Sequence, residues 1–276
     1  MAQAERTVSP PHKLGFLRTL RTDAWWFEPG MIAIFLSVFL GYLTISAFID
    51  GWKYSVGPYL SPVFEPELHG KYSAWYFSPA LLILWVPIGF RATCYYYRRA
   101  YYRSYLFSPP ACAVGDIGGL GNLRPSTKYD GESKFPLVLQ NLHRFFMYGA
   151  LVFGVFLWYG AIKSFYNTES VIDGHPADTG WGIGLGSIIL CINATLLMMY
   201  TFSCHSFRHF IGGGLDCFSC TLVSRTRKRF WDRVSAWNTN HRLYAWMSLV
   251  WIAFTDIYIR LVANGHITDP NTWKGF

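Results

Sequence analysis

The stretch "GWGIGLGSIILCINATLLMMYTF", residues 180–202, contains no charged side chain. A helix needs about 20 mainly apolar residues to cross the hydrocarbon core of a bilayer, so this stretch predicts a membrane-spanning helix. It runs directly into "SCHSFRHFIGGGLDCFSC", residues 203–220, which contains two histidines, a glycine run and several cysteines. The sequence thus places potential metal ligands directly beside a predicted membrane span.

Other stretches have a similar length and apolar character, namely 30–49, 75–96, 146–165 and 243–262. The chain is 52% hydrophobic and only 14% charged, whereas a soluble domain carries about a quarter charged residues. We therefore predict an all-α fold with one membrane-anchor domain over residues 1–276. This domain would be an integral membrane bundle of five transmembrane helices with ordered cytoplasmic loops.

Lys and Arg gather on one side of the predicted membrane. With five spans, the N-terminus and the loops after the second and fourth spans share a side, and 19 of the 24 Lys and Arg residues lie there. The positive-inside rule places that side, and hence the N-terminus, in the cytoplasm. The formal net charge of +8 is then a topological signal with membrane lipid as its partner, and no nucleic-acid partner is expected.

The cytoplasmic loops are long enough to dock a partner protein. One of them, residues 108–136, is rich in Gly and Pro and is expected to form an ordered loop. Five of the six cysteines lie at or beyond the cytoplasmic ends of spans, and none lies on the outer side, where disulfides persist. This distribution is typical of reduced thiols that could bind a metal.

His205 and His209 are one helical turn apart, and Cys217 and Cys220 form a C-x-x-C pair after a glycine run that would end the helix. Such a cysteine pair commonly holds one iron or zinc ion. Together the residues could bind zinc as a structural site, or a two-iron, two-sulfur cluster of Rieske type. The alternative is purely structural, with the histidines at lipid headgroups and the cysteines buried as small apolar groups.

The segment "SFRHFIGGGLD", residues 206–216, resembles the G-x-R-H-x-x-x-D stretch in membrane anchors of succinate dehydrogenases and fumarate reductases. Arg208 and His209 stand at the Arg-His pair, while Ser206 replaces the glycine. The segments "NLHRFFMYG" and "NTNHRLYAW" each open a span with a His-Arg pair followed by aromatic residues. With its five-span layout and large cytoplasmic loops, the chain looks like the heme-less, cytochrome b-like anchor subunit of an actinobacterial succinate dehydrogenase.

This resemblance implies a multi-pass protein of the bacterial inner membrane. Its partners would be a flavoprotein subunit and an iron–sulfur subunit on the cytoplasmic side, and its substrate would be a quinone, menaquinone in many such bacteria. The chain would belong to a quinone-reducing succinate dehydrogenase without carrying succinate chemistry itself. The alternatives are a multi-span transporter, which the lack of matching inverted halves disfavours, and a zinc-stabilised membrane scaffold.

The cofactor expectation also follows from the resemblance. Heme-containing relatives carry an axial histidine seven residues before the motif histidine, and this chain has Phe202 there, which argues against heme b. A heme-less anchor still has to carry electrons from its partner's last cluster to the quinone. The resemblance therefore favours a Rieske-like 2Fe–2S cluster over zinc, with the ligands His205, His209, Cys217 and Cys220.

Quinone reduction needs an apolar slot, hydrogen-bond donors at the quinone carbonyls and proton donors. We expect these roles among polar and aromatic residues near the cytoplasmic face: Arg208, His241, His143, Trp231, Trp237, Tyr244 and Asp216. The reverse assignment stays open, with His143 and His241 as metal ligands and His205 and His209 beside the quinone.

Two ionisable residues, Asp256 and Arg260, fall within the last predicted span near its outer end. Ionisable groups inside a membrane are costly and usually functional. At a spacing of four residues on a helix they can pair with each other. The alternative is a second, outer quinone site or a proton path.

Overall fold

The computed structural model describes residues 21–48, 53–66, 80–107, 110–112, 114, 133, 135, 137–172 and 174–273. The chain divides into two compact units. One comprises Met1–Val38 with Tyr95–Val138, and the other comprises Phe39–Cys94 with Leu139–Phe276. Helices make up most of the described residues of both units, in agreement with the predicted helical class.

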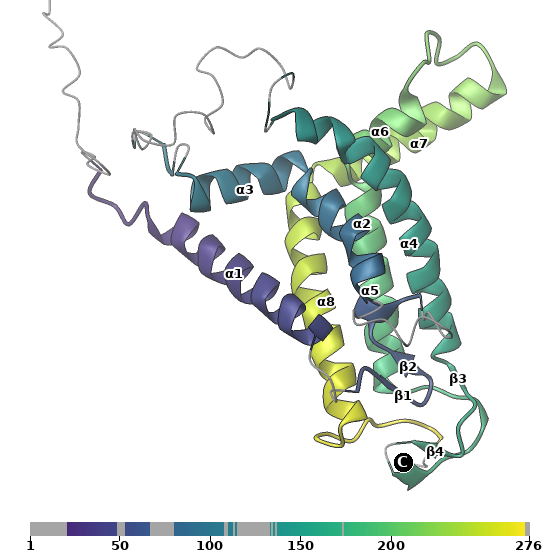
Figure 1. The fold of residues 1–276 in the computed structure, drawn as a ribbon. Coiled ribbons are helices and arrows are strands. Elements are labelled where there is room, and N and C mark those ends of the chain that lie inside the picture. Colours follow the sequence, from purple (N-terminus) through teal and green to yellow (C-terminus); the bar gives the residue numbers. More distant parts are fainter. Residues whose placement is uncertain are drawn as a thin grey trace, which may run out of the picture. The chain divides into compact units, whose positions relative to one another are not determined.

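The first unit contains the start of α1 (Phe27–Phe48) and the helix α3 (Tyr95–Tyr105), both drawn in Figure 1. Helix α3 is amphipathic and buries Tyr97, Ala100, Tyr102 and Ser104. The hydroxyl of Tyr105 donates to the carbonyl of Ala33 at 2.9 Å and lies 2.8 Å from the Ser37 hydroxyl. These bonds tie the end of α3 to the first half of α1.

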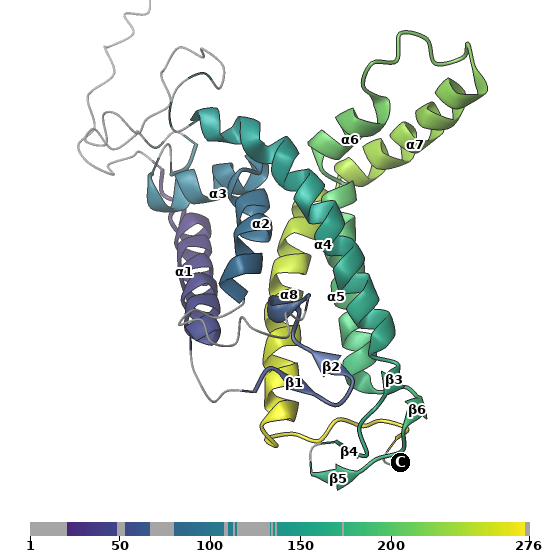
Figure 2. The same cartoon turned by 45° about the vertical axis from the view of Figure 1, so that its right-hand side comes forward.

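The second unit is a helical bundle that includes the remainder of α1. Its longer helices are α2 (Ala80–Ala92), α4 (His143–Lys163), α5 (Leu185–Phe202) and α8 (His241–Ala263). Helix α5 packs against both α4 and α8. Two further helices, α6 (His205–Gly212) and α7 (Leu222–Asn238), project from the end at which α4 and α8 begin, as Figures 1 and 2 show. Short 3-10 segments are η1 (Pro62–Phe64) and η4 (Leu137–Leu142).

Four described helices are long and apolar enough to cross a membrane: Phe27–Ala47, Val138–Lys163, Leu185–Phe202 and His241–Ala263. They lie where spans were predicted, at 30–49, 146–165, 180–202 and 243–262. The span predicted at 75–96 is described only in part, as the shorter apolar helix Leu82–Ala92, because residues 67–79 lie outside the described part. That span and the cytoplasmic N-terminus stay predictions, and nearly all of the loop predicted at 108–136 also falls outside the described residues.

Small residues allow the helices of the second unit to approach closely. A Cβ atom added to Gly154 on α4 would lie 2.0 Å from the sulfur of Met198 on α5, so a larger residue here would require the Met198 side chain to shift. Close approach at small residues is a common basis of helix packing in membranes. The apolar core of the unit includes Ala161, Ile189, Leu190, Ala194, Ile259 and Val262.

The all-α prediction missed three short antiparallel strand pairs. They are β1 (Ser55–Val56) with β2 (Tyr59–Leu60), β3 (Tyr166–Asn167) with β6 (Gly180–Trp181), and β4 (Val171–Ile172) with β5 (His175–Pro176). They lie at the opposite end of the bundle from α6 and α7 (Figure 2). Strands of two residues are too short to give a periodic signal in the sequence.

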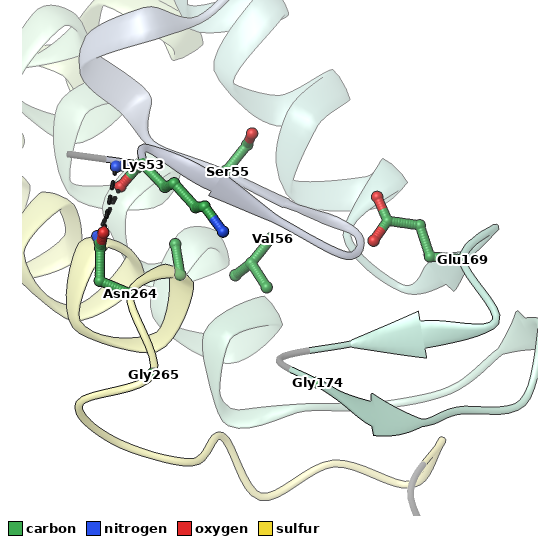
Figure 3. Close-up of a pocket in the computed structure, with 8 residues that line it drawn as sticks. Lys53, Ser55, Val56, Glu169, Gly174, Asn264 and Gly265 are labelled. Carbon is green, nitrogen blue, oxygen red and sulfur yellow. Dashed lines mark hydrogen bonds between the residues drawn. The ribbon is translucent and has the colours of Figure 1, made fainter. Parts of the chain in front are cut away.

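An open recess of about 500 Å³ lies at this strand-bearing end of the second unit. Its lining comprises Lys53, Ser55, Val56, Glu169, Gly174, Ala263, Asn264 and Gly265. Figure 3 shows the side chain of Asn264 bonded to the backbone of Lys53, with 3.4 Å from the Lys53 nitrogen and 3.2 Å to its carbonyl. These bonds tie the end of α8 to the chain before β1, and no histidine or cysteine belongs to the described lining.

A buried ion pair anchors the C-terminal part of α8. The Asp256 carboxylate lies 3.0 Å from Nε of Arg260, and the two side chains are 0% and 1% exposed. The hydroxyls of Tyr42 and Ser61 also donate to Asp256, and Arg260 donates to the carbonyl of Ser46 at 3.0 Å. The prediction that Asp256 and Arg260 pair is confirmed.

We expect Asp256→Ala to destabilise the folded subunit by about 3–5 kcal/mol, because it leaves the buried Arg260 charge without its carboxylate. The matched control is Asp232→Ala, which breaks the pair of the same helical spacing with Lys228, whose side chains are 52% and 34% exposed. That change should cost less than about 1 kcal/mol. Thermal unfolding of the detergent-solubilised subunit measures both, and equal small shifts would contradict the assigned role of the pair.

Candidate functional site

Four side chains from separate chain segments meet at the end of the bundle where α4 and α8 begin. His143 is the first residue of α4, and its Nε2 lies 2.9 Å from the thiol of Cys204. His241 is the first residue of α8, and its Nε2 lies 3.5 Å from the thiol of Cys94. We call Cys94, His143, Cys204 and His241 the His–Cys cluster. His143 and both cysteines are buried, and His241 is half-buried.

The two cysteines sit in equivalent turns between helices. Cys94 separates α2 from α3, and its N–H donates to the carbonyl of Arg91 at 3.2 Å. Cys204 separates α5 from α6, and its N–H donates to the carbonyl of Thr201 at 3.2 Å. In both turns the preceding residue carries a hydroxyl and closes the last helical turn through its own N–H. The sequence pattern of an apolar helix, a hydroxyl residue and a cysteine therefore produces the same local structure twice.

Each histidine of the cluster is held through its second ring nitrogen. Nδ1 of His143 lies 3.1 Å from the hydroxyl of Thr93, and Nδ1 of His241 lies 2.8 Å from the hydroxyl of Ser203. Thr93 and Ser203 are the residues directly before the two cysteines. Each turn thus supports a histidine with its hydroxyl and offers a thiol to the other histidine.

Aromatic rings fix the planes of the imidazoles. Phe90 stacks on His143 with ring centroids 4.8 Å apart, and Tyr200 stacks on His241 at 5.0 Å. Phe90 and Tyr200 also contact each other edge to face at 5.2 Å. The two histidines are therefore packed against one continuous aromatic group contributed by α2 and α5.

Arg91 brings a positive charge to this aromatic group. Its guanidinium lies over the ring of Tyr200, 4.7 Å from the centroid. It donates to the hydroxyl of Ser248 at 2.9 Å and to the carbonyl of Ala245 at 3.1 Å. These bonds hold the charge between α2 and α8, next to the ring that stacks on His241.

The donor set of the His–Cys cluster suits a metal centre. Two thiols and two imidazoles form the ligand set of a Rieske cluster, in which cysteines bind one iron and histidines the other, and also of a tetrahedral zinc site. In the described residues no group of three or more His, Cys, Asp or Glu is arranged to hold a metal ion. Burial, followed by the nearby Cys94 thiol, raises the pKa of Cys204 to about 12, so ligation would require this thiol to lose its proton.

The structure does not support the predicted site at His205, His209, Cys217 and Cys220. Helix α5 ends at Phe202, and the two histidines lie on the separate helix α6. Both side chains are exposed, and their Nε2 atoms are 3.0 Å apart. Cys217 and Cys220 are joined to each other as a disulfide and supply no thiolates. The glycine run does end α6, as predicted, but the chain beyond it does not return the cysteines to the histidines as a ligand group.

The predicted quinone-binding residues fall into two places. His143 and His241 belong to the His–Cys cluster. The ring of Trp237 stacks on that of Phe202, with centroids 6.4 Å apart. Tyr244 lies one turn after His241 on α8. The others lie on or beside the α6–α7 hairpin, where the Arg208 guanidinium sits 4.5 Å from the ring centroid of Trp231, and Asp216 is exposed.

Sequence reasoning missed Cys94 and Cys204 as partners of His143 and His241. The signal available was a repeated one, a hydroxyl–cysteine pair directly after an apolar helix, combined with the two His-Arg helix starts. Arg91 was visible as a charged residue near the end of a predicted span. Its contacts were not, because Ala245 and Ser248 lie 154 and 157 positions further along the chain.

The fold and the site define a class of protein, namely a multi-span membrane subunit with a buried His–Cys cluster at one end of its bundle. Residues 27–265 match the family described as the actinobacterial succinate dehydrogenase subunit SdhC. The chain belongs to this family. The resemblance noted from the sequence is therefore confirmed.

A solved structure supports the same conclusion. The chain is similar to a chain of the Mycobacterium smegmatis Sdh1 complex in the apo form, with 39% sequence identity and a TM-score of 0.74. The similarity covers 94% of this chain and 96% of the other. A comparison with curated proteins returned no match. As an SdhC subunit with several apolar helices, the chain is a multi-pass protein of the bacterial inner membrane.

The chemical reactivity of the thiols tests the geometry of the cluster. The thiolate is the reactive form of cysteine, and both burial and the raised pKa keep Cys204 from forming it. We expect N-ethylmaleimide at about pH 8 to modify the exposed Cys112 of the folded subunit but not Cys94 or Cys204. Peptide mass spectrometry reads the modification, and denaturation should expose all three. Equal labelling of Cys112 and Cys204 before denaturation would contradict the buried cluster.

Proposed function

We propose that this chain is the quinone-reducing membrane anchor of a succinate dehydrogenase. In this role it binds a flavoprotein subunit and an iron–sulfur subunit on the cytoplasmic side and delivers their electrons to a membrane quinone, menaquinone in particular. Family membership supports the place in the complex. The His–Cys cluster is the observation that carries the redox part of the proposal.

We further propose that the His–Cys cluster holds a Rieske-type 2Fe–2S cluster. Cys94 and Cys204 would ligate one iron, and His143 and His241 the other. When bound, such a cluster supplies one-electron transfer at a potential that its histidine ligands raise. Support comes from the donor set, from the direction of both Nε2 atoms toward the thiols, and from the burial of the site.

The surrounding residues suit a buried centre that carries negative thiolates. Buried charge is costly unless it is compensated nearby, and the guanidinium of Arg91 provides a fixed positive charge one ring away from His241. Phe90 and Tyr200 exclude water from one side of the imidazoles and hold their planes. The chain therefore offers ligands, orientation and charge compensation from its own side chains.

The quinone would bind at the same end of the bundle. The ring of Trp237 stacks on that of Phe202, two residues before Cys204, and Tyr244 lies one turn after His241 on α8; the two aromatic rings could form a wall for the quinone head. Asn238 supports this position, since its amide donates to the carbonyl of Ser203 at 2.6 Å. Arg208, Trp231 and Asp216 remain proposed quinone residues from the side of the α6–α7 hairpin.

Cysteine substitution separates the two candidate ligand sets. In the complete complex we expect Cys94→Ser or Cys204→Ser to abolish an EPR signal of Rieske type and to reduce succinate:menaquinone reductase activity at least about tenfold, because a ligand is lost. Succinate oxidation with a soluble dye, which needs only the partner subunits, should stay unchanged. Cys217→Ser is the matched control and should leave the signal and both activities intact.

Other results would contradict the ligand set, the iron cluster or its role in electron transfer. Loss of the signal in Cys217→Ser alone would restore the ligand set first predicted from the sequence. A complex that contains zinc but no additional iron would replace the iron cluster by a structural site with the same donors. A menaquinone reductase activity that no cysteine substitution affects would contradict an electron-carrying role for this cluster.

A further inference from the structure

We infer that Thr93 and Ser203 are positioning residues that hold both cluster histidines in the tautomer with the proton on Nδ1. This leaves the lone pair of each Nε2 directed at the metal side of the site. The inference rests on the proposed Rieske-type cluster and extends it from the ligands to the groups that prepare them.

The hydroxyl of Thr93 has a single proton to donate. The Thr93 oxygen lies 2.7 Å from the carbonyl oxygen of Gly89. Two oxygens approach this closely only with a hydrogen between them, and a carbonyl has none to give. The hydroxyl proton of Thr93 is therefore committed to Gly89. Toward Nδ1 of His143, at 3.1 Å, the Thr93 oxygen can only accept, so Nδ1 has to carry the proton.

Ser203 repeats the arrangement at the other histidine. Its hydroxyl donates to the carbonyl of Tyr200 at 3.0 Å, which uses its only proton. Its distance of 2.8 Å to Nδ1 of His241 then requires that nitrogen to donate. Two independent turns, in different helices, thus impose the same tautomer on two histidines.

The consequence appears at the opposite ring nitrogen. A neutral imidazole with its proton on Nδ1 presents a lone pair at Nε2, which is the form that binds a metal. In this structure Nε2 of His143 faces Cys204 and Nε2 of His241 faces Cys94. The α2–α3 turn bonds His143 through the Thr93 hydroxyl and places the Cys94 thiol beside His241. The α5–α6 turn bonds His241 through Ser203 and places Cys204 beside His143.

Burial makes the hydroxyls hard to replace by water. Thr93 is 7% exposed and Ser203 is fully buried. If either hydroxyl were removed, the imidazole N–H would lose this acceptor, which is costly in a buried site. The ring could then turn, or change its tautomer, and either change would weaken Nε2 as a ligand.

A purely local role is the competing explanation. Ser and Thr hydroxyls often bond to the carbonyl three or four residues earlier in a helix, and both residues do so here. That role would be lost equally in Thr93→Val and Ser203→Ala, but it would leave the histidine nitrogens unaffected. The test therefore has to read the histidines of the cluster directly.

The experiment uses the complete complex with 15N-labelled histidine and compares Thr93→Val and Ser203→Ala with Thr93→Ser and Ser203→Thr. Pulsed EPR reads the coupling of the remote histidine nitrogen, and a chelator challenge reads how fast the cluster loses iron. We expect changed nitrogen couplings and about 10- to 100-fold weaker iron retention in the Val and Ala variants, as for loss of other metal-supporting groups. The conservative Ser and Thr variants should restore both.

The two halves of the site provide separate readings, so one variant that fails to assemble does not decide the result. Flavin content of the purified complex reports assembly. Unchanged couplings and iron retention in an assembled Thr93→Val or Ser203→Ala complex would overturn the inference while leaving the cluster in place. A wild-type complex without any Rieske-type signal would overturn the proposed cluster and this inference together.

Discussion

The contacts between two histidine rings and two thiols hold the second unit together at one end. Each member of the His–Cys cluster comes from a different segment, namely the α2–α3 turn, the start of α4, the α5–α6 turn and the start of α8. Buried polar groups are stable only with partners, so the four segments have to reach the same point. Helices α2 and α5 end, and α4 and α8 begin, where the four side chains can meet.

The opposite end of the unit uses the same physical rule with different groups. There the buried carboxylate of Asp269 accepts the hydroxyls of Tyr59 and Tyr258, at 2.7 and 2.6 Å, and the N–H of Gly186 at the start of α5. The ion pair of Asp256 and Arg260 lies on the neighbouring turns of α8. Between the two polar ends, the core of the unit contains apolar residues of α4, α5 and α8 such as Ala161, Ala194 and Ile259, while large apolar side chains such as Val155 are exposed.

The long helices could be predicted because their signal is local. A run of about 20 apolar residues predicts a span without knowledge of its neighbours, and α1, α4, α5 and α8 begin and end within a few residues of the predicted runs. The His–Cys cluster has no such local signal, since its two contacts join residues 61 and 147 positions apart. The C-x-x-C spacing instead drew the prediction to Cys217 and Cys220, which bond to each other. The histidines of the His–Cys cluster were visible in the repeated His-Arg helix starts, and its cysteines lay in the repeated hydroxyl–cysteine pairs.

A cryo-EM map of the assembled complex, at a resolution that separates metal–ligand bonds from hydrogen bonds, would show whether the His–Cys cluster holds iron. We expect compact density for two irons and two sulfides between Cys94, Cys204, His143 and His241, with Thr93 and Ser203 behind the histidines. Histidine rings in direct contact with the thiols and no density between them would contradict it, as would a cluster held elsewhere in the chain.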